Sequence, residues 1–213
     1  IMTRSERVAV NIADGYTRVS NGRPGIACAV QCNAGIENSF AGVAQAYADG
    51  VPILILPLGN DRHVSSAWPN VEAAPAYQRV TKWAAQINCA ARVPELMRRA
   101  FTCLQMGRPG PVLLEMPADV ATEALGSDAL DYRPVVPARS CAEPAAVAGA
   151  VRALLAARQP IIHAGQGVLY AGAWDELREL AELLHIPVMT TMNGKSAFPE
   201  DHPLALGFGG RKG

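Results

Sequence analysis

The strongest constraint on this fold is an alternation of strand-like and helix-like segments along the chain. A run of apolar residues from Val51 to Leu58, with a proline near its start, predicts a buried central strand. Segments with helical periodicity precede and follow this run, which favours an α/β fold with a mainly parallel sheet. The predicted helices are 5–19, 35–49, 73–80, 93–105, 144–157 and 173–184, and the predicted strands are 25–31, 51–58, 83–88, 112–117, 160–164 and 186–191.

The pattern predicts two domains. Residues 1–117 form the first, residues 118–142 lack periodicity and suit a linker, and residues 143–213 begin a second. The second unit offers only two strands and two helices, which is too little sheet for a stable doubly wound domain. We therefore expect the chain to be a fragment, or its ends to be missing.

Composition excludes several classes of function. The formal net charge is zero, so no electrostatic footprint for nucleic acid or an anionic membrane is visible. The longest apolar runs are far shorter than the roughly 20 residues of a membrane span, and no apolar leader is visible at the start. The five cysteines show neither a CxxC pair nor metal-ligand spacing, which suits reduced thiols. A cytoplasmic protein is expected.

A single carboxylate, Glu6, stands near the start of the first predicted helix. Glu6, Ala9 and Ala13 recur at helical spacing, so the carboxylate would point along a stripe of small residues where a flat ring could lie. Val8, Ile12 and Tyr16 form a second, apolar stripe on the same helix. An alternative stays open, because Thr3-x-x-Glu6 matches a capping box in which Glu6 only reaches a backbone N–H.

Several short strings, taken in order and spacing, resemble thiamine-diphosphate enzymes of the acetolactate synthase kind. The resemblance covers the chain from Arg4 to its last residue. The strings are Arg4-x-Glu6, Ala13-Asp14-Gly15-Tyr16, Gly22-x-Pro24-Gly25, Ala46-Tyr47-Ala48-Asp49-Gly50-Val51-Pro52, Gly107-Arg108-Pro109-Gly110-Pro111-Val112, Pro117-Ala118-Asp119-Val120 and Gly194-Lys195-Ser196-Ala197-Phe198-Pro199.

The resemblance implies a domain assignment. Residues 1–117 would be the pyrimidine-binding domain without its first strand, and residues 143–213 the N-terminal part of a Rossmann-like central domain, which holds FAD in acetolactate synthases. The family's third domain, which binds diphosphate and Mg²⁺ through Gly-Asp-Gly and an Asn pair, has no counterpart in this sequence. No metal site is therefore expected here. The family's cofactor lies between subunits, so at least a homodimer, or a homotetramer, is implied.

The resemblance also implies the chemistry. Glu6 would hydrogen-bond to the pyrimidine ring nitrogen of thiamine diphosphate, as the catalytic acid/base, with its pKa raised by an apolar pocket. The implied reaction makes or breaks a C–C bond in a 2-oxo acid or related carbonyl compound, as in acetolactate synthase. A 2-oxo acid decarboxylase or C–C hydrolase of the same family is an alternative. A catalytically inert dimerising or regulatory piece is another.

The turn after the first predicted strand is the second candidate for contact with thiamine diphosphate. Gly35 and Asn38 match the family's turn, whereas Gln31, Cys32 and Asn33 depart from it. Asn33 could cap the following helix, which is compatible with a cofactor contact, and no histidine is placed to activate Cys32 as a nucleophile. After the central strand, Asn60 is a stand-in for the glutamine of acetolactate synthases. Lys82, which the family also has, could equally be a solvated surface residue.

For FAD, the resemblance points to one arginine and to two turns of the second unit, although Gly-x-Gly alone is weak evidence. An empty central domain or an ADP-type ligand is the competing reading. The candidate residues are Arg108, Gly165, Gln166, Gly167, Thr191 and Met192, with Thr190 and Asn193 beside them.

Overall fold

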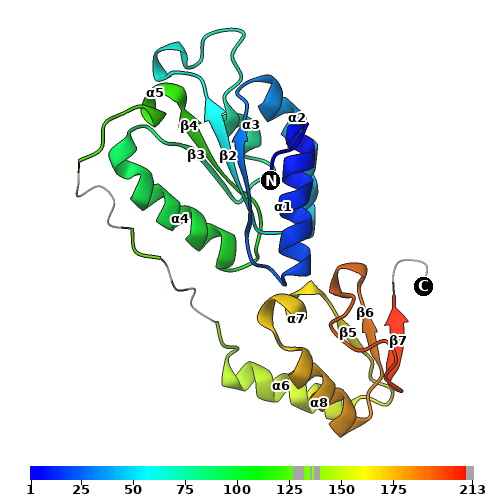
Figure 1. Cartoon of the computed structure of the whole chain (residues 1–213). Coiled ribbons are helices and arrows are strands. Elements are labelled where there is room, and N and C mark those ends of the chain that lie inside the picture. Colours follow the sequence, from blue (N-terminus) through cyan, green and yellow to red (C-terminus); the bar gives the residue numbers. More distant parts are fainter. Residues whose placement is uncertain (127–131, 135, 137–139, 210–213) are drawn as a thin grey trace. The chain divides into compact units, whose positions relative to one another are not determined.

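A computed structural model describes residues 1–126, 132–134, 136 and 140–209. The chain divides into two compact units, residues 1–138 and 139–213. Figure 1 shows the helices and strands of each unit, and each unit is described by itself. In the described part of the chain, no helix has the length and apolar character that crossing a membrane requires.

Unit 1 is built on a four-stranded parallel sheet, as the alternation of segments predicts. The strand order is β1-β2-β4-β3, and Gly25 of β1 pairs with Ile53 of β2. Because all strands run the same way, their carboxyl ends lie at one edge of the sheet. The strands are β1 (Gly25–Val30), β2 (Ile53–Gly59), β3 (Trp83–Gln86) and β4 (Val112–Pro117).

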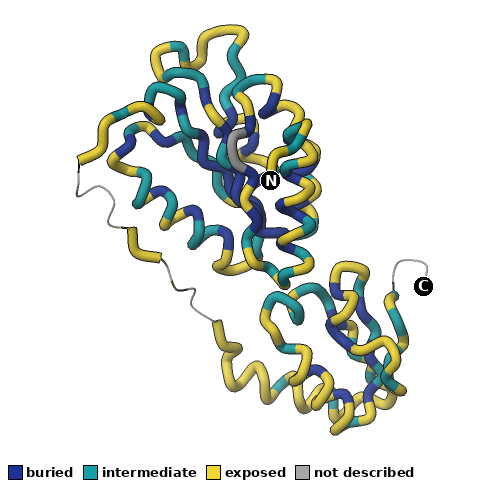
Figure 2. The backbone as a smooth tube through the Cα atoms, in the orientation of Figure 1, coloured by how far each residue is buried: buried dark blue, intermediate teal, exposed yellow. Residues whose placement is uncertain are grey.

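Helices cover both faces of this sheet. Ile53 and Ile55 of β2 join the buried cluster under α1, α2 and α3, whereas Leu54 between them joins the cluster under α4. This follows from the alternation of side chains along a strand, and Figure 2 shows the buried strands between exposed outer surfaces. The helices are α1 (Glu6–Val19), α2 (Ala34–Asp49), α3 (Ala73–Tyr77) and α4 (Val93–Gln105), with the short turns η1 (Arg62–Val64) and η2 (Ala90–Arg92).

Helix α1 packs through its small residues rather than its large ones. Its buried side chains are Val10, Ala13, Asp14 and Thr17, while the expected apolar stripe of Val8, Ile12 and Tyr16 stays 41–51% exposed. Gly42 on α2 explains the close approach of the two helices, because a Cβ there would lie 2.8 Å from Cγ1 of Val10.

The segment after β4 differs from the expected linker. Helix α5 (Ala118–Ala121) follows β4 directly, and Val120 is buried in the cluster under α4. The described start of the predicted linker 118–142 therefore belongs to unit 1. Part of that linker lies outside the described residues.

Unit 2 contains a parallel sheet of order β5-β6-β7. Ala164, Leu177, Ala181, Val188 and Phe198 form its buried cluster. Within the described residues, the sequence prediction missed β7, the short η4, and α7, which begins where a glycine turn was expected. The elements are α6 (Pro144–Ala156), β5 (Ile162–Ala164), α7 (Gln166–Ala171), α8 (Trp174–Leu184), β6 (Val188–Thr190), η4 (Met192–Gly194) and β7 (Ala205–Phe208).

Candidate functional site

The carboxyl edge of the unit 1 sheet gathers the residues proposed for thiamine diphosphate. The chain leaves β1 at Gln31 and enters α2 at Ala34, and α1 starts at the same edge with Glu6. A Cβ on Gly35 would lie 2.8 Å from Cβ of Gln31 and 3.1 Å from Oε1 of Glu6. Gly35 therefore allows the turn and the carboxylate to meet, at the edge where ligands of parallel sheets bind.

The Glu6 carboxylate is held by the first turns of α2. The Nδ2 amide of Asn38 donates a hydrogen bond to Oε2 of Glu6 over 2.8 Å. That bond and, secondly, the backbone N–H of Glu6 lower the pKa of the carboxyl group, against a smaller opposing effect of burial. The pKa of Glu6 is thus lowered in this chain alone, because hydrogen bonds to the charged form outweigh burial, and a raised pKa under a bound ring stays a prediction.

Two further expectations about Glu6 are corrected. No capping box forms, because α1 begins at Glu6 itself behind Ser5, and the Thr3 hydroxyl donates to the Ser5 carbonyl oxygen at 2.9 Å. Nor does the carboxylate follow the stripe of small residues. Ala13 packs against Gly25 of β1, whereas Glu6 turns towards α2.

Asn33 joins the turn after β1 to the loop after β2. Its Oδ1 accepts hydrogen bonds from the backbone N–H of Val71 at 2.8 Å and from Nδ2 of Asn60 at 3.2 Å. Its φ is 56°, in the left-handed region that asparagine tolerates better than most residues. Asn33 precedes α2, but its side chain makes no capping hydrogen bond, so the capping alternative is wrong.

Beside this turn lies an apolar cavity of about 620 Å³. It occupies the α4 face of the sheet near its carboxyl edge. Cys32, in the same turn, is a half-buried free thiol. The lining residues of the cavity are Gln31, Leu56, Pro57, Leu58, Ile87, Val93, Met97 and Met116.

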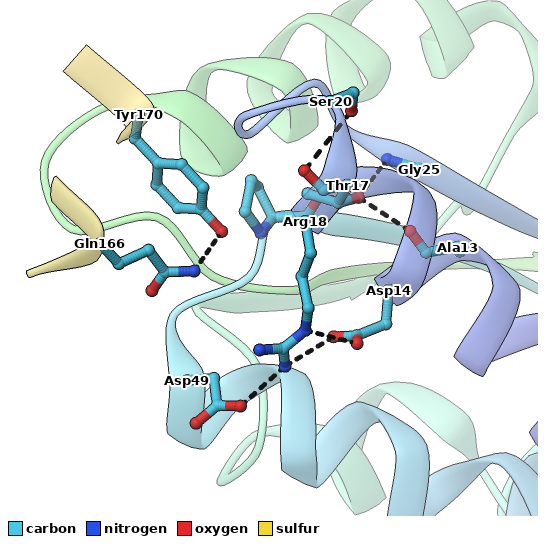
Figure 3. A network of polar contacts seen from close by, with 10 residues as sticks. Ala13, Asp14, Thr17, Arg18, Ser20, Gly25, Asp49, Gln166 and Tyr170 are labelled. Atoms are coloured by element: carbon cyan, nitrogen blue, oxygen red, sulfur yellow. Dashed lines mark hydrogen bonds and ion pairs between the residues drawn. The ribbon is translucent and has the colours of Figure 1, made fainter. Parts of the chain in front are cut away.

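The far ends of α1 and α2 are clamped by Arg18. Its Nε lies 2.7 Å from Oδ2 of Asp14, and its Nη2 lies 2.7 Å from Oδ2 of Asp49 (Figure 3). The hydrogen bond to Asp14 is the main reason why the pKa of Arg18 is raised. The backbone N–H of Gly25 donates to the Thr17 hydroxyl at 2.8 Å, which fixes the same end of α1 to β1. The register that brings Glu6 to Asn38 is thereby fixed at both ends of the helix pair.

Lys82 and Arg108 lie away from this edge, at the amino ends of the strands. Nζ of Lys82 donates to the carbonyl oxygens of Cys103 and Met106, at the end of α4, while Lys82 stays exposed, as the surface alternative expects. Nη2 of Arg108 donates to the carbonyl oxygen of Ala48 at 3.0 Å.

The candidates in unit 2 share the carboxyl edge of its own sheet. The backbone N–H of Thr191 donates to the carbonyl oxygen of Ala164, and the Thr191 hydroxyl accepts from the N–H of Gly194. Gly165 lies beside them: its Cβ would be 4.0 Å from Oγ1 of Thr191. Thr190 is 3% exposed, and its hydroxyl has no hydrogen-bond partner among the residues that the structure describes. Met192 is exposed, and Gln166 donates to the Tyr170 hydroxyl at 2.6 Å.

Sequence reasoning missed two polar features of the unit 1 edge. Arg62 pairs with Asp119 at 2.6 Å and with Glu123 at 2.7 Å, and so joins the loop after β2 to the segment after β4. Glu115, 1% exposed in the middle of β4, accepts the N–H groups of Ala73 and Ala74. The sequence string around Asp119 was a signal for the pairing with Arg62. The lone glutamate in an apolar strand was a signal for the contacts of Glu115. Within the described ranges, no cluster of His, Cys, Asp and Glu could hold a metal ion.

Two family models match the chain. The model described as "Thiamine pyrophosphate enzyme, N-terminal TPP binding domain" matches residues 1–78, and the model described as "Thiamine pyrophosphate enzyme, central domain" matches residues 147–213.

Curated relatives agree with these matches. The probable acetolactate synthase large subunit of Methanocaldococcus jannaschii is 36% identical over 229 residues, with 100% of this chain and 37% of the relative covered. The glyoxylate carboligase of Escherichia coli O157:H7 is 33% identical, with 99% and 36% covered. The probable 2-ketoarginine decarboxylase of Pseudomonas aeruginosa is 35% identical, with 97% and 37% covered. The chain thus spans just over a third of the length of these relatives.

A solved structure matches as well. It is described as a putative thiamin diphosphate-dependent enzyme isolated from Mycobacterium smegmatis, with a TM-score of 0.77 and 28% sequence identity. The match covers 97% of this chain and 40% of that one.

Proposed function

Because the chain belongs to the thiamine pyrophosphate enzyme family, we propose that it supplies Glu6 as the acid/base carboxylate of an enzyme acting on 2-oxo acids. The proposed reaction forms or breaks a C–C bond next to a carbonyl group, with acetolactate-synthase-like carboligation as the leading form. Residues 1–117 together with α5 would be the pyrimidine-binding domain, the remainder of 118–142 the linker, and 143–213 part of the central domain.

The observation that best supports this proposal is the close approach of Glu6 and Gly35. A Cβ at Gly35 would occupy the space against the Glu6 carboxylate, and Asn38 holds that carboxylate at the edge of the sheet. These features fit thiamine diphosphate, because its ring needs a fixed carboxylate and close approach to backbone. Residues that would hold it are Glu6, Gln31, Cys32, Asn33, Gly35, Asn38 and Asn60. The bound group supplies a carbon nucleophile and an electron sink.

Glu6 would accept and return a proton at its carboxylate. Its pKa is lowered while water reaches it, and a flat ring that covered it would remove this water. Desolvation favours the neutral form of a carboxyl group, so ligand binding would raise the pKa of Glu6 towards working pH. Proton transfer by such a group contributes about 10²–10⁴-fold to a rate.

Substitution of Glu6 tests the assignment. In the full-length protein, Glu6→Gln should reduce turnover by about 10²–10⁴-fold, because an amide cannot exchange the proton. Circular dichroism and the melting temperature should stay unchanged, because Glu6 lies at a helix start and is half-exposed. Glu37→Gln, which neutralises an exposed carboxylate on the neighbouring α2, is the matched control. Full turnover in Glu6→Gln would refute the role.

The relatives include a synthase, a carboligase and a decarboxylase, so the reaction itself needs a direct assay. A panel of 2-oxo acids, followed for CO₂ release and for acyl products, separates these outcomes. CO₂ with a condensed product supports carboligation, and CO₂ with an aldehyde supports decarboxylation. Carboxylate release without CO₂ supports the C–C hydrolase alternative.

The departures at Gln31, Cys32 and Asn33 weaken the acetolactate-synthase-like form, and an inert dimerising or regulatory piece is the second candidate. The reading frame of the gene discriminates between the two. A downstream Gly-Asp-Gly with an Asn pair would support the enzyme, its Mg²⁺ site and a homodimer or homotetramer in the cytoplasm. A reading frame without them would favour the inert piece.

FAD is proposed as the ligand of unit 2, with an ADP-type ligand or no ligand as alternatives. The Thr190 hydroxyl, which has no partner in the described part of the chain, and the open space at Gly167 support a ligand with polar groups at this edge. Gly165, Gln166, Thr191 and Met192 would line it. The purified full-length protein should then show flavin absorbance, and a colourless active protein would contradict FAD.

A further inference from the structure

Asn38 contacts the carboxylate on which the proposed function rests. The two residues are 32 positions apart, and their hydrogen bond of 2.8 Å joins the starts of two parallel helices. Gly35 lies one turn before Asn38 on α2. A Cβ at Gly35 would lie 3.1 Å from Oε1 and 3.2 Å from Cγ of Glu6. One oxygen is thus bonded to Asn38, while the other lies over Gly35.

The geometry points to Asn38 as a positioning residue, which acts through the Glu6 carboxylate rather than by touching the ligand. This inference rests on the proposed function, and it changes the role given to Asn38 there. An amide can only donate to an ionised carboxylate, so the bond fixes the side-chain rotamer of Glu6 and favours its charged form. The ligand would then meet a carboxylate that is already oriented.

The other groups around Glu6 do not replace this contact. The charged side chains nearest in sequence are Arg4, just before α1, Arg7 on α1, and Glu37 beside Asn38 on α2. The lowered pKa of Glu6 arises first from the Asn38 hydrogen bond and second from a backbone N–H, with no ion pair among its causes. Arg18 and Asp49, at the far ends of the helices, fix the register but do not reach the carboxylate.

Titration of Glu6 in the ligand-free full-length protein tests the inference without activity. Glutamate labelled with ¹³C at the carboxyl carbon gives a signal for each residue, and the signal lost in Glu6→Gln assigns Glu6. Asn38→Ala should raise the apparent pKa of Glu6 by about half to one unit, because the charged form loses a hydrogen bond. Asn38→Asp should raise it further, because it adds a like charge.

Gln45→Ala is the matched control. Gln45 is an exposed amide two turns further along α2, so its truncation makes the same chemical change away from Glu6. Its Glu6 titration should equal that of the unsubstituted protein. Retained circular dichroism in all variants shows that the helix pair is intact.

The pH profile of turnover gives the second measurement. With Asn38→Ala, the acid limb of kcat/KM should move to higher pH by the same amount as the titration. Lost turnover with an unchanged titration would overturn the inference, because Asn38 would then contact the ligand or substrate directly. An unchanged titration and profile would overturn it too. If Glu6→Gln is fully active while Asn38→Ala still shifts the titration, the proposed function fails and the positioning contact stands.

Discussion

The carboxyl edges of the two parallel sheets differ in how their polar groups are satisfied. In unit 1, side chains from distant segments meet there: Glu6 with Asn38, and Asn33 with Asn60 and Val71. In unit 2, the side-chain hydrogen bonds at the edge, from Gly194 to Thr191 and from Gln166 to Tyr170, are short in sequence, and the Thr190 hydroxyl is buried without a partner among the described residues.

The two units also differ in how far their helices are buried. Helices cover both faces of the unit 1 sheet, whereas α6 of unit 2 has no buried residue. A site needs side chains held by packing and by hydrogen bonds before the ligand arrives. Unit 1 meets this condition within the chain. Among the described residues, unit 2 has a buried hydroxyl without a partner and a helix, α6, whose side chains are not buried.

The largest expected effect tests the buried polar contact of unit 1. Glu115→Ala should lower the free energy of unfolding of unit 1 by about 3 kcal/mol, because it strands two buried N–H groups and leaves a cavity. Hydrogen exchange followed by mass spectrometry, with peptides from each unit read separately, measures it. Glu115→Gln, which keeps one acceptor oxygen, should lose less. Equal protection in Glu115→Ala would show that unit 1 does not depend on this contact.

A smaller effect is expected at the turn after β1. Asn33→Ala should cost about 2 kcal/mol, because it removes the bonds to Val71 and Asn60 and places alanine at a φ of 56°. Asn33→Gly also removes the bonds but relieves the backbone, so it should cost about 1 kcal/mol less. Chemical denaturation of both variants measures the difference. Equal losses would mean that the hydrogen bonds dominate and the backbone conformation contributes little.

A substitution at the carboxyl edge of the unit 2 sheet should stabilise the protein rather than destabilise it. Thr190→Val removes an unpartnered buried hydroxyl while keeping the side-chain shape, so it should stabilise ligand-free unit 2 by about 1 kcal/mol. Exchange protection of peptides around β6 is the measurement. If flavin is bound in the purified protein, the same change should weaken its retention. Destabilisation of flavin-free protein would mean that the hydroxyl has a partner after all.

The smallest effect is a pH dependence of unit 1. Burial raises the pKa of Tyr77 above its ordinary value of 10.0, against a smaller opposite effect of Ser39. The stabilisation is complete below about pH 10 and is lost as pH rises towards the folded-state pKa, because the unfolded tyrosine ionises first. Denaturation midpoints between pH 9 and about 11 should therefore fall. Tyr77→Phe should flatten this decline while costing the bond to the Ile36 carbonyl oxygen at neutral pH.

Sequence patterns predicted the elements of unit 1 closely and those of unit 2 less well. The helix 93–105 and the strand 112–117 match α4 and β4 residue for residue, because prolines and glycines delimit two strongly patterned segments. Helix α7 and strand β7 were missed. Both are short, so they offer too few residues for a period to show.

The candidate site, too, was predicted only in part. The sequence placed Glu6 at a helix start and the turn around Asn33 after a strand, because periodicity and the resemblance both act on neighbouring residues. It did not supply the partner of Glu6, the bond from Val71 to Asn33 or the sign of the Glu6 pKa shift.

What the sequence alone determined is the α/β alternation, the parallel sheet and the residues that collect at its carboxyl edge. The tertiary structure decided which of them touch. Asn38 reaches Glu6 across 32 positions only because Gly42 and Gly35 let the two helices pack closely and Arg18 fixes their register. Such contacts depend on distances between segments far apart in the chain, and a local pattern carries no information about those distances.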